Sequence, residues 1–252
     1  MNINTYLQRI HYTGSRNPTI ETLRALHRAH LLSIPFENLS IHTGERIRLN
    51  YKWLFNKIVT RRRGGFCYEL NGLFSSLLTE LGFRVEMLSA RVARSDGSFG
   101  PDFDHMVLRV ELEESWLVDV GFGESYLEPI RLDFRGEQLD PAGKFCIVEL
   151  DGGLGMQEWE DGQFVTQHFF TLMPHTLADY KAMCHYHQTS TESSFTRKIV
   201  CSQATQDGRV TVSENRFICT RGGIREEIEL AGADEVRIAL DAHFGINWKP
   251  ME

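Results

Sequence analysis

The spacing of apolar residues changes once along this chain, near residue 83, and that change restricts the fold. Up to residue 83, apolar side chains recur every three or four positions, which is the period of amphipathic helices. From residue 84 to about 185, short runs alternate apolar and polar residues between turns rich in Gly, Asp and Pro, as antiparallel strands do. The remainder mixes strand-like runs with a last helical stretch. This order predicts an α+β fold.

We expect three units: residues 1–83 as a helical bundle, 84–185 as an antiparallel β-barrel or sandwich, and 186–252 as a small α/β unit. The strand candidates of the middle unit are RVEMLSARV, HMVLRVEL, SWLVDVGF and KFCIVEL, whereas DGGLGMQEWEDG is expected to be a loop or a hairpin connection. In the last unit, FTRKIVCSQ and GRVTVSENRFICT are predicted as strands and ADEVRIALDAHFGI as a helix.

Three helices are predicted in the first unit. The segment PTIETLRALHRAHLLSI has a plausible cap at Thr19, and Pro35 stops it. The segment YKWLFNKIVT forms the second helix. The third begins near Cys67, gathers its apolar residues on one side, and ends at Gly82.

Charge and cysteine content exclude several classes of protein. The net charge is -7, and the basic run Arg61–Arg63 is too short for a nucleic-acid face. No segment approaches the roughly 20 apolar residues of a membrane span, and the N-terminus lacks the apolar block of a signal peptide. The five cysteines are odd in number and scattered, without CxxC or HExxH spacing. We therefore expect a cytoplasmic protein with reduced thiols and no metal, membrane or nucleic-acid partner.

Cys67 has three features that favour a nucleophile over a core cysteine. It lies at the beginning of a predicted helix, where free N–H groups and the helix dipole stabilise an anion. It follows Gly64 and Gly65, which allow a sharp turn that keeps the thiol accessible. The three arginines just upstream would also stabilise a thiolate. The other reading, a solvated turn before a helix, remains open on these residues alone.

A nucleophilic thiol needs a base and a group that orients the base. Of the ten histidines, His105 opens a strongly patterned strand, and Asp119 lies between apolar residues on the next strand. A buried carboxylate requires a donor, and an imidazole N–H is suitable. A tight turn at Glu113 and Glu114 would place Asp119 opposite Leu108 or Arg109. The two side chains then meet only if the pairing is bulged or His105 folds back from the strand end.

The segments RRGGFCYELN, HMVLRVELEESWLVDVGFG, AHLLSIPFENLSIH and YKAMCHYHQTSTESSFTR together resemble the arylamine N-acetyltransferase family over nearly the whole chain. The resemblance implies a helical bundle, a central antiparallel β-barrel and a C-terminal α/β lid around a Cys-His-Asp core like that of cysteine proteases. It also implies that Cys67 is the acetylated nucleophile, His105 its base and Asp119 the residue that orients the base. No metal is implied.

Further roles are expected near this core, of which the coenzyme A loop is implied by the same resemblance. Gly121 and Gly123 would form the coenzyme A loop, and Phe122 between them would line the acceptor pocket. Arg63 is expected to pair with Glu37 as a structural ion pair. Arg221 and Arg225 are candidates for contacts to the phosphates of coenzyme A, and His185 and His187 belong to a crossover towards the lid.

The predicted reaction is a ping-pong transfer of acetyl from acetyl-CoA, the donor substrate, to an arylamine or arylhydrazine. The nearest alternative is a cysteine-dependent hydrolase of thioesters or amides, since Cys-His-Asp arrangements also catalyse hydrolysis. A non-catalytic binding module is a third possibility, and the intact set of Cys67, His105 and Asp119 argues against it.

Overall fold

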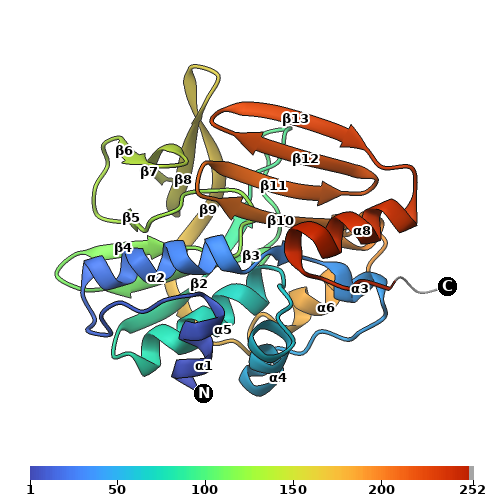
Figure 1. Cartoon of the computed structure of the whole chain (residues 1–252). Helices are drawn as coiled ribbons and strands as arrows, with labels where there is room; N and C mark the ends of the chain where they lie inside the picture. Colours follow the sequence, from blue (N-terminus) through green and yellow to red (C-terminus); the bar gives the residue numbers. More distant parts are fainter. Residues whose placement is uncertain (250–252) are drawn as a thin grey trace.

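The structure, a computed structural model, describes residues 1–249. Figure 1 shows the N-terminal helices below two antiparallel sheets, with the C-terminal helix packed on the second sheet. The helical elements are α1 (Ile3–Arg9), α2 (Ile20–Ser33), α3 (Leu39–His42), α4 (Tyr51–Phe55), the π-helix η1 (Asn56–Thr60), α5 (Cys67–Glu80), α6 (Lys181–Thr189), α7 (Ser194–Arg197) and α8 (Ala233–Phe244).

The larger sheet has eight antiparallel strands in the order β5-β4-β3-β2-β9-β8-β7-β6. Its edge strand β5 contacts β7 near the opposite edge, so the sheet curls into a nearly closed barrel. This confirms the predicted α+β class with a central barrel. The strands are β2 (Arg84–Val92), β3 (His105–Glu111), β4 (Ser115–Val118), β5 (Ile130–Arg131), β6 (Gln138–Asp140), β7 (Gly143–Leu150), β8 (Gly153–Glu160) and β9 (Gln163–His175).

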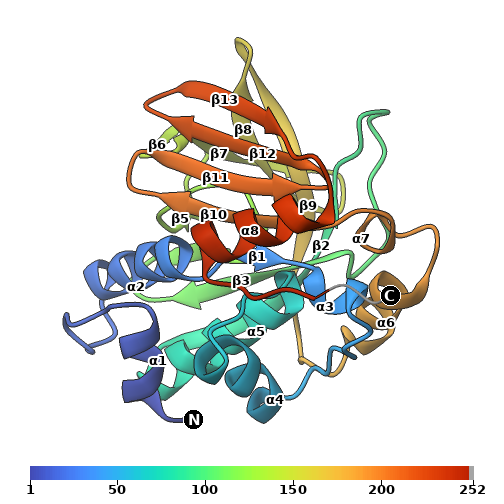
Figure 2. The same cartoon turned by 45° about the vertical axis from the view of Figure 1, so that its right-hand side comes forward.

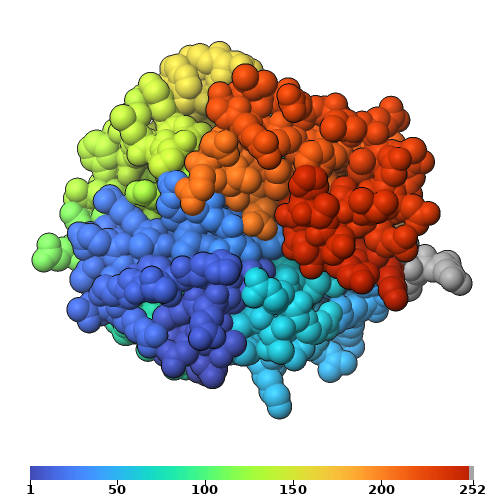
Figure 3. Space-filling view, in the orientation of Figure 1, coloured from blue at the N-terminus to red at the C-terminus, as the bar shows by residue number. Residues whose placement is uncertain are grey.

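The smaller sheet contains strands from both the N-terminal and the C-terminal regions of the chain. Its order is β1-β10-β11-β12-β13, and the short strand β1 from the N-terminal region pairs with β10. Figure 2 shows α8 lying against this sheet, and Figure 3 shows the sheet's surface meeting both the barrel and the N-terminal helices. The strands are β1 (Phe36–Glu37), β10 (Val200–Thr205), β11 (Gly208–Ser213), β12 (Arg216–Arg221) and β13 (Ile224–Glu229).

The helix α2 follows the prediction from its sequence. The Thr19 side chain accepts a hydrogen bond from the backbone N–H of Thr22, and Ile34 ends the helix directly before Pro35. The segment YKWLFNKIVT is helical as predicted, but its second half is a π-helix. Gly82 adopts a φ of +92° after α5, which suits a glycine at a helix end.

Two predictions of secondary structure were wrong. The segment DGGLGMQEWEDG contains the strand β8, preceded by a turn at residues 151–152. The glycines of this segment are unfavourable in strands, so its sequence indicates a loop. Gly153 is nevertheless required in the strand, because a Cβ there would lie 2.5 Å from the carbonyl oxygen of Phe170. The last unit contains four strands rather than two. All six residues of β13 are exposed, so no alternation of buried and exposed positions marks this strand.

A cluster of buried charges lies beneath the start of α5. Lys57, fully buried on η1, donates to both carboxylate oxygens of Glu69, at 2.8 and 2.9 Å, and lies 3.6 Å from Glu37. Arg63 donates to Glu37 at 2.9 Å, the pair predicted from the sequence. Because burial makes each unpaired charge costly, this cluster fixes η1, β1 and α5 relative to one another.

Three groups of buried apolar side chains fill the molecule: one around α5, one inside the barrel, and one between the smaller sheet and α8.

The division of the chain into three units at residues 83/84 and 185/186 stays a proposal. Over residues 1–249, the helices include none that is both long and apolar enough to cross a membrane.

Replacing Lys57 by Met should destabilise the protein strongly, because the buried carboxylate of Glu69 would lose its paired cation and Glu37 would keep only Arg63. We expect the free energy of unfolding in urea to fall by about 3–5 kcal/mol. Lys52→Met is the matched control, since Lys52 is exposed on the neighbouring helix, and its change should stay within about 0.5 kcal/mol. Equal effects of the two substitutions would contradict the role of the charge cluster.

Candidate active site

Cys67 is the first residue of α5, and its position depends on the preceding turn. Glu69 accepts a hydrogen bond from the backbone N–H of Phe66 at 3.2 Å, so the start of the helix is capped by its own first turn. A Cβ on Gly64 would lie 2.0 Å from the carbonyl oxygen of Pro35. The glycine therefore permits close packing of two backbone segments. It does not expose the thiol, since Cys67 is only 3% exposed.

The imidazole of His105 and the carboxylate of Asp119 are in direct contact. His105 Nε2 lies 2.6 Å from Asp119 Oδ2, and both side chains are buried. Residues 111 and 115 pair across a three-residue turn, so Leu108 faces Val118, and Asp119 lies one position beyond the end of β4. The predicted register was therefore wrong by one residue for Leu108 and by two for Arg109. Neither a bulge nor a folded-back His105 is needed, because the chain leaves the ladder after Val118.

Two residues outside the predicted site, Asn71 and His27, hold Asp119 in place. Asn71, one helical turn after Cys67, donates to Asp119 Oδ1 at 2.8 Å and to the carbonyl of Met106 at 2.7 Å, and accepts from the N–H of Val120 at 2.9 Å. His27 on α2 contacts the backbone of Asp119 from the other side. The spacing of four residues between Cys67 and Asn71 is the one signal that places both on a single helix face.

The electrostatic surroundings of Asp119 keep it ionised. Burial raises the pKa of this carboxyl, but the charge and hydrogen bond of His105, with the Asn71 amide, lower it more, so the net direction is downward. The backbone N–H of Gly121 also donates to Oδ1, at 2.8 Å. Asp119 is thus a fixed anion that holds the proton of His105 on Nε2 and leaves Nδ1 for another partner.

The thiol of Cys67 lies beside the first residues of β3. Burial raises its pKa well above the ordinary value, and the negative charges of Asp119 and Asp104 add to that, whereas a hydrogen bond from the backbone of Met106 lowers it. Met106 directly follows His105, so the sulfur and the His105–Asp119 pair lie at the same end of β3.

Two of the three upstream arginines are paired with carboxylates and not with this thiol, contrary to prediction. Arg61 is paired with Glu45, and Arg63 with Glu37. Their charges are therefore already compensated by carboxylates. Positive charge that could stabilise a thiolate has to come from the imidazole of His105.

The segment after Asp119 packs closely on the site. The Phe122 ring meets the His105 ring edge to face, with centroids 5.1 Å apart, and is half-buried. A Cβ on Gly121 would lie 2.7 Å from the Cα of Cys67, so this glycine lets the segment touch α5. Gly123 has a φ of +95°, and its carbonyl accepts a hydrogen bond from Arg209 on β11. Contacts of Gly121 and Gly123 with coenzyme A stay a prediction.

The remaining histidines near the site have distinct surroundings. His168, which no sequence pattern singled out, is fully buried, its ring 5.6 Å from that of His105 and 5.4 Å from that of Phe122. Burial lowers its pKa to about 3, so it is neutral. His187 contacts the hydroxyl of Ser193 at 3.0 Å in the crossover after α6, and His185 is exposed.

The two arginines considered for phosphate contacts lie on the smaller sheet. Arg225 is paired with Glu227 at 3.1 Å, so its charge is already partly compensated. Arg221 ends β12 and is exposed. Both lie on the outer strands β12 and β13, and their assignment to coenzyme A stays a prediction.

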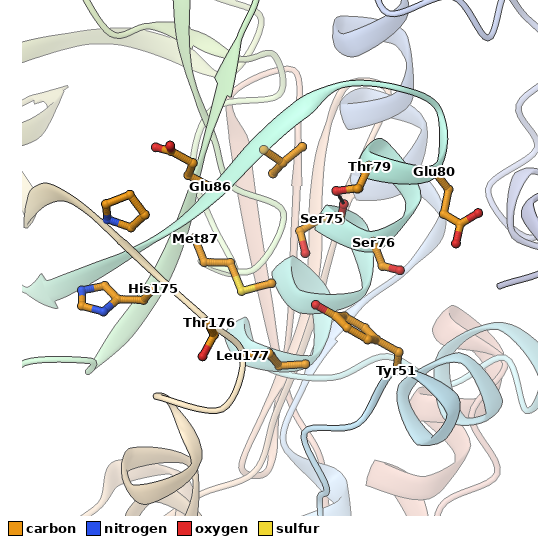
Figure 4. Close-up of a pocket in the computed structure, with 12 residues that line it drawn as sticks. Tyr51, Ser75, Ser76, Thr79, Glu80, Glu86, Met87, His175, Thr176 and Leu177 are labelled. Atoms are coloured by element: carbon orange, nitrogen blue, oxygen red, sulfur yellow. Dashed lines mark hydrogen bonds between the residues drawn. The ribbon is translucent and has the colours of Figure 1, made fainter.

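The cavity drawn in Figure 4 is separate from these residues. It has a volume of about 410 Å³ and lies between the second half of α5, β2 and residues 174–177. Cys67, His105 and Asp119 are not among its lining residues. Within residues 1–249, no group of three or more His, Cys, Asp or Glu side chains is placed to hold a metal ion.

Comparisons with known proteins agree with the fold and with each other. A family model described as N-acetyltransferase matches residues 19–251. The chain is 36% identical to an arylamine N-acetyltransferase, pineal gland isozyme, of Gallus gallus, over 96% of this chain and 90% of that protein. It is 33% identical to arylamine N-acetyltransferase 1 of Homo sapiens, over 98% and 94%. The structure of Mycobacterium marinum arylamine N-acetyltransferase in complex with CoA superposes with a TM-score of 0.92 at 32% identity, over 98% of this chain and 93% of that one.

The contacts of Asn71 generate a prediction about stability. Asn71→Ala removes three buried hydrogen bonds and leaves the carboxylate of Asp119 with fewer donors. We expect the free energy of unfolding to fall by about 2–4 kcal/mol. The exposed Asn17→Ala should change it by less than about 0.5 kcal/mol. If both variants unfold at the same denaturant concentration as the unchanged protein, Asn71 does not hold Asp119.

Proposed function

The chain belongs to the arylamine N-acetyltransferase family, and from this premise we propose that it transfers acetyl from acetyl-CoA to arylamines or arylhydrazines through an acetyl-cysteine intermediate. Membership of the family makes it an acyltransferase. Cys67 is the proposed nucleophile, His105 the base and Asp119 the residue that orients the base. The observation that carries this assignment is the 2.6 Å contact between His105 and Asp119 at the end of β3 where the Cys67 thiol lies.

The first half of the proposed reaction loads the enzyme. The Cys67 thiol gives its proton to His105 Nδ1 as the sulfur attacks the thioester carbonyl of acetyl-CoA. The negative charge that develops on the carbonyl oxygen is stabilised by the backbone N–H of Cys67 at the helix start. The bond to the sulfur of coenzyme A then breaks, and His105 returns the proton to that sulfur. Free coenzyme A leaves, and a thioester remains on Cys67.

The second half delivers the acetyl group. The nitrogen of the acceptor attacks the carbonyl of acetyl-Cys67, His105 takes a proton from that nitrogen, and the carbon–sulfur bond breaks as the amide forms. The proton then returns to the Cys67 sulfur. An arylamine suits this step because its nitrogen is largely unprotonated at neutral pH. Phe122 offers an aromatic wall for its ring beside His105.

The low exposure of Cys67 makes proton transfer to His105 essential in this scheme. A lone thiolate at this buried position would be costly, whereas a thiolate beside an imidazolium is compensated. A cytoplasmic location is part of the same proposal and rests on the cysteine pattern of the sequence.

Release of coenzyme A tests the two-step scheme. With acetyl-CoA alone, we expect a burst of about one equivalent of free thiol per enzyme that then stops, because the acetyl group waits on Cys67 for an amine. Cys67→Ser should abolish the burst, and Cys146→Ser, at a buried cysteine on β7, should leave it unchanged. Continuous release without an amine would instead indicate a cysteine-dependent hydrolase.

A further inference from the structure

A hollow of about 590 Å³ lies between α6 and residues 46–50, the segment that joins α3 to α4. Figures 1 and 2 both show α3 and α6 on the same side of the molecule. Arg46 and Arg48 line the hollow from the segment, and Lys181 and His185 line it from the helix. None of its lining residues is acidic. That composition is unusual in a chain whose net charge is -7.

The positive charges around this hollow are uncompensated. In the part of the chain that the structure describes, Arg46, Arg48 and Lys181 form no ion pair, and their side chains make no hydrogen bond. Arginines a few residues further on behave differently, since Arg61 and Arg63 are both paired with carboxylates. All three side chains are exposed, so their charged groups are free to contact an anion from solution.

The base of the hollow is rigidly built. Gln188 on α6 accepts a hydrogen bond from the backbone N–H of Ile47 at 2.7 Å and donates to the carbonyl of Cys184 at 3.0 Å. Ile47 and Cys184 are themselves buried. The segment that carries Arg46 and Arg48 is therefore fixed to α6, and the cations project from a defined surface.

The helix adds to the positive field. Lys181 is the first residue of α6, where the helix dipole already has its positive end, and the first turn contains no acidic residue. A lysine is slightly unfavourable at this position, and the carboxylate nearest to it in sequence, Asp179, accepts hydrogen bonds from Thr176. Its fourth neighbour along the helix, His185, projects on the same face and into the same hollow.

We propose that this hollow, defined by Arg46, Arg48, Lys181 and His185, binds a small, multiply charged phosphate compound, such as an organic phosphate or a pyrophosphate. Two guanidinium groups can each contact phosphate oxygens with paired N–H donors, and the ammonium group adds a point charge. The volume is that of a small-molecule site. Two sources supply such a group: the phosphorylated end of coenzyme A, and a free organic phosphate.

Calorimetric titration of the full chain with inorganic pyrophosphate tests the site. We expect saturable binding that weakens by about tenfold or more in Arg46→Gln with Arg48→Gln, since two charged contacts are lost. The matched control is Arg16→Gln with Arg94→Gln, which removes the same charge from exposed arginines elsewhere and should leave the affinity within about twofold. Absence of saturable binding, or an equal loss in the control, would overturn the proposal.

Two further measurements identify which phosphate compound the hollow binds. They also separate a failure of this proposal from a failure of the proposed function. Displacement of pyrophosphate by 3′,5′-ADP, with a raised KM for acetyl-CoA in the double variant, assigns the site to the donor. Displacement by other organic phosphates with an unchanged KM assigns it to a free phosphate. Cys67→Ser should bind pyrophosphate as the unchanged protein does, because the hollow does not include Cys67.

Discussion

One buried carboxylate connects the parts of this molecule. Asp119 lies just beyond the end of β4, accepts from His105 on β3 and from Asn71 on α5, and has its backbone contacted by His27 on α2. A buried carboxylate is stable only when its oxygens have donors, so helix and barrel must pack in a single arrangement to satisfy it. That arrangement also brings the first residue of α5, Cys67, to the end of β3.

The sequence predicted the elements that carry the site better than the contacts between them. Helical periodicity placed Cys67 at a helix start, and alternation placed His105 at the first residue of its strand. The hairpin register was wrong by one or two residues, because the sequence does not show how many residues the turn at Glu113 and Glu114 contains. His27 gave no separate signal, and Asn71 gave only its spacing of four residues from Cys67, since a polar residue in an amphipathic pattern is ordinarily exposed. Their burial depends on the distant Asp119.

Charge compensation also explains why two arginines close to Cys67 in the sequence do not stabilise its thiolate, contrary to prediction. The arginines before Cys67 are close to it in the chain, yet Glu37 and Glu45 neutralise two of them. Glycines 64 and 121 allow backbones to approach, and the thiol itself is buried. A buried thiol beside a fixed anion has a raised pKa, so its reactivity must come from the imidazole that Asp119 holds. Activation therefore depends on a pair of groups, not on the cysteine alone.

The most direct measurement of that pair is the pH dependence of alkylation at Cys67, followed by mass spectrometry of the modified peptide. We expect the rate to persist well below the ordinary thiol pKa of about 8.5, since a thiolate–imidazolium pair is already ionised there. In His105→Gln the rate should follow the raised pKa of an isolated buried thiol. If both proteins lose reactivity at the same pH, at or above the ordinary value, His105 does not activate Cys67.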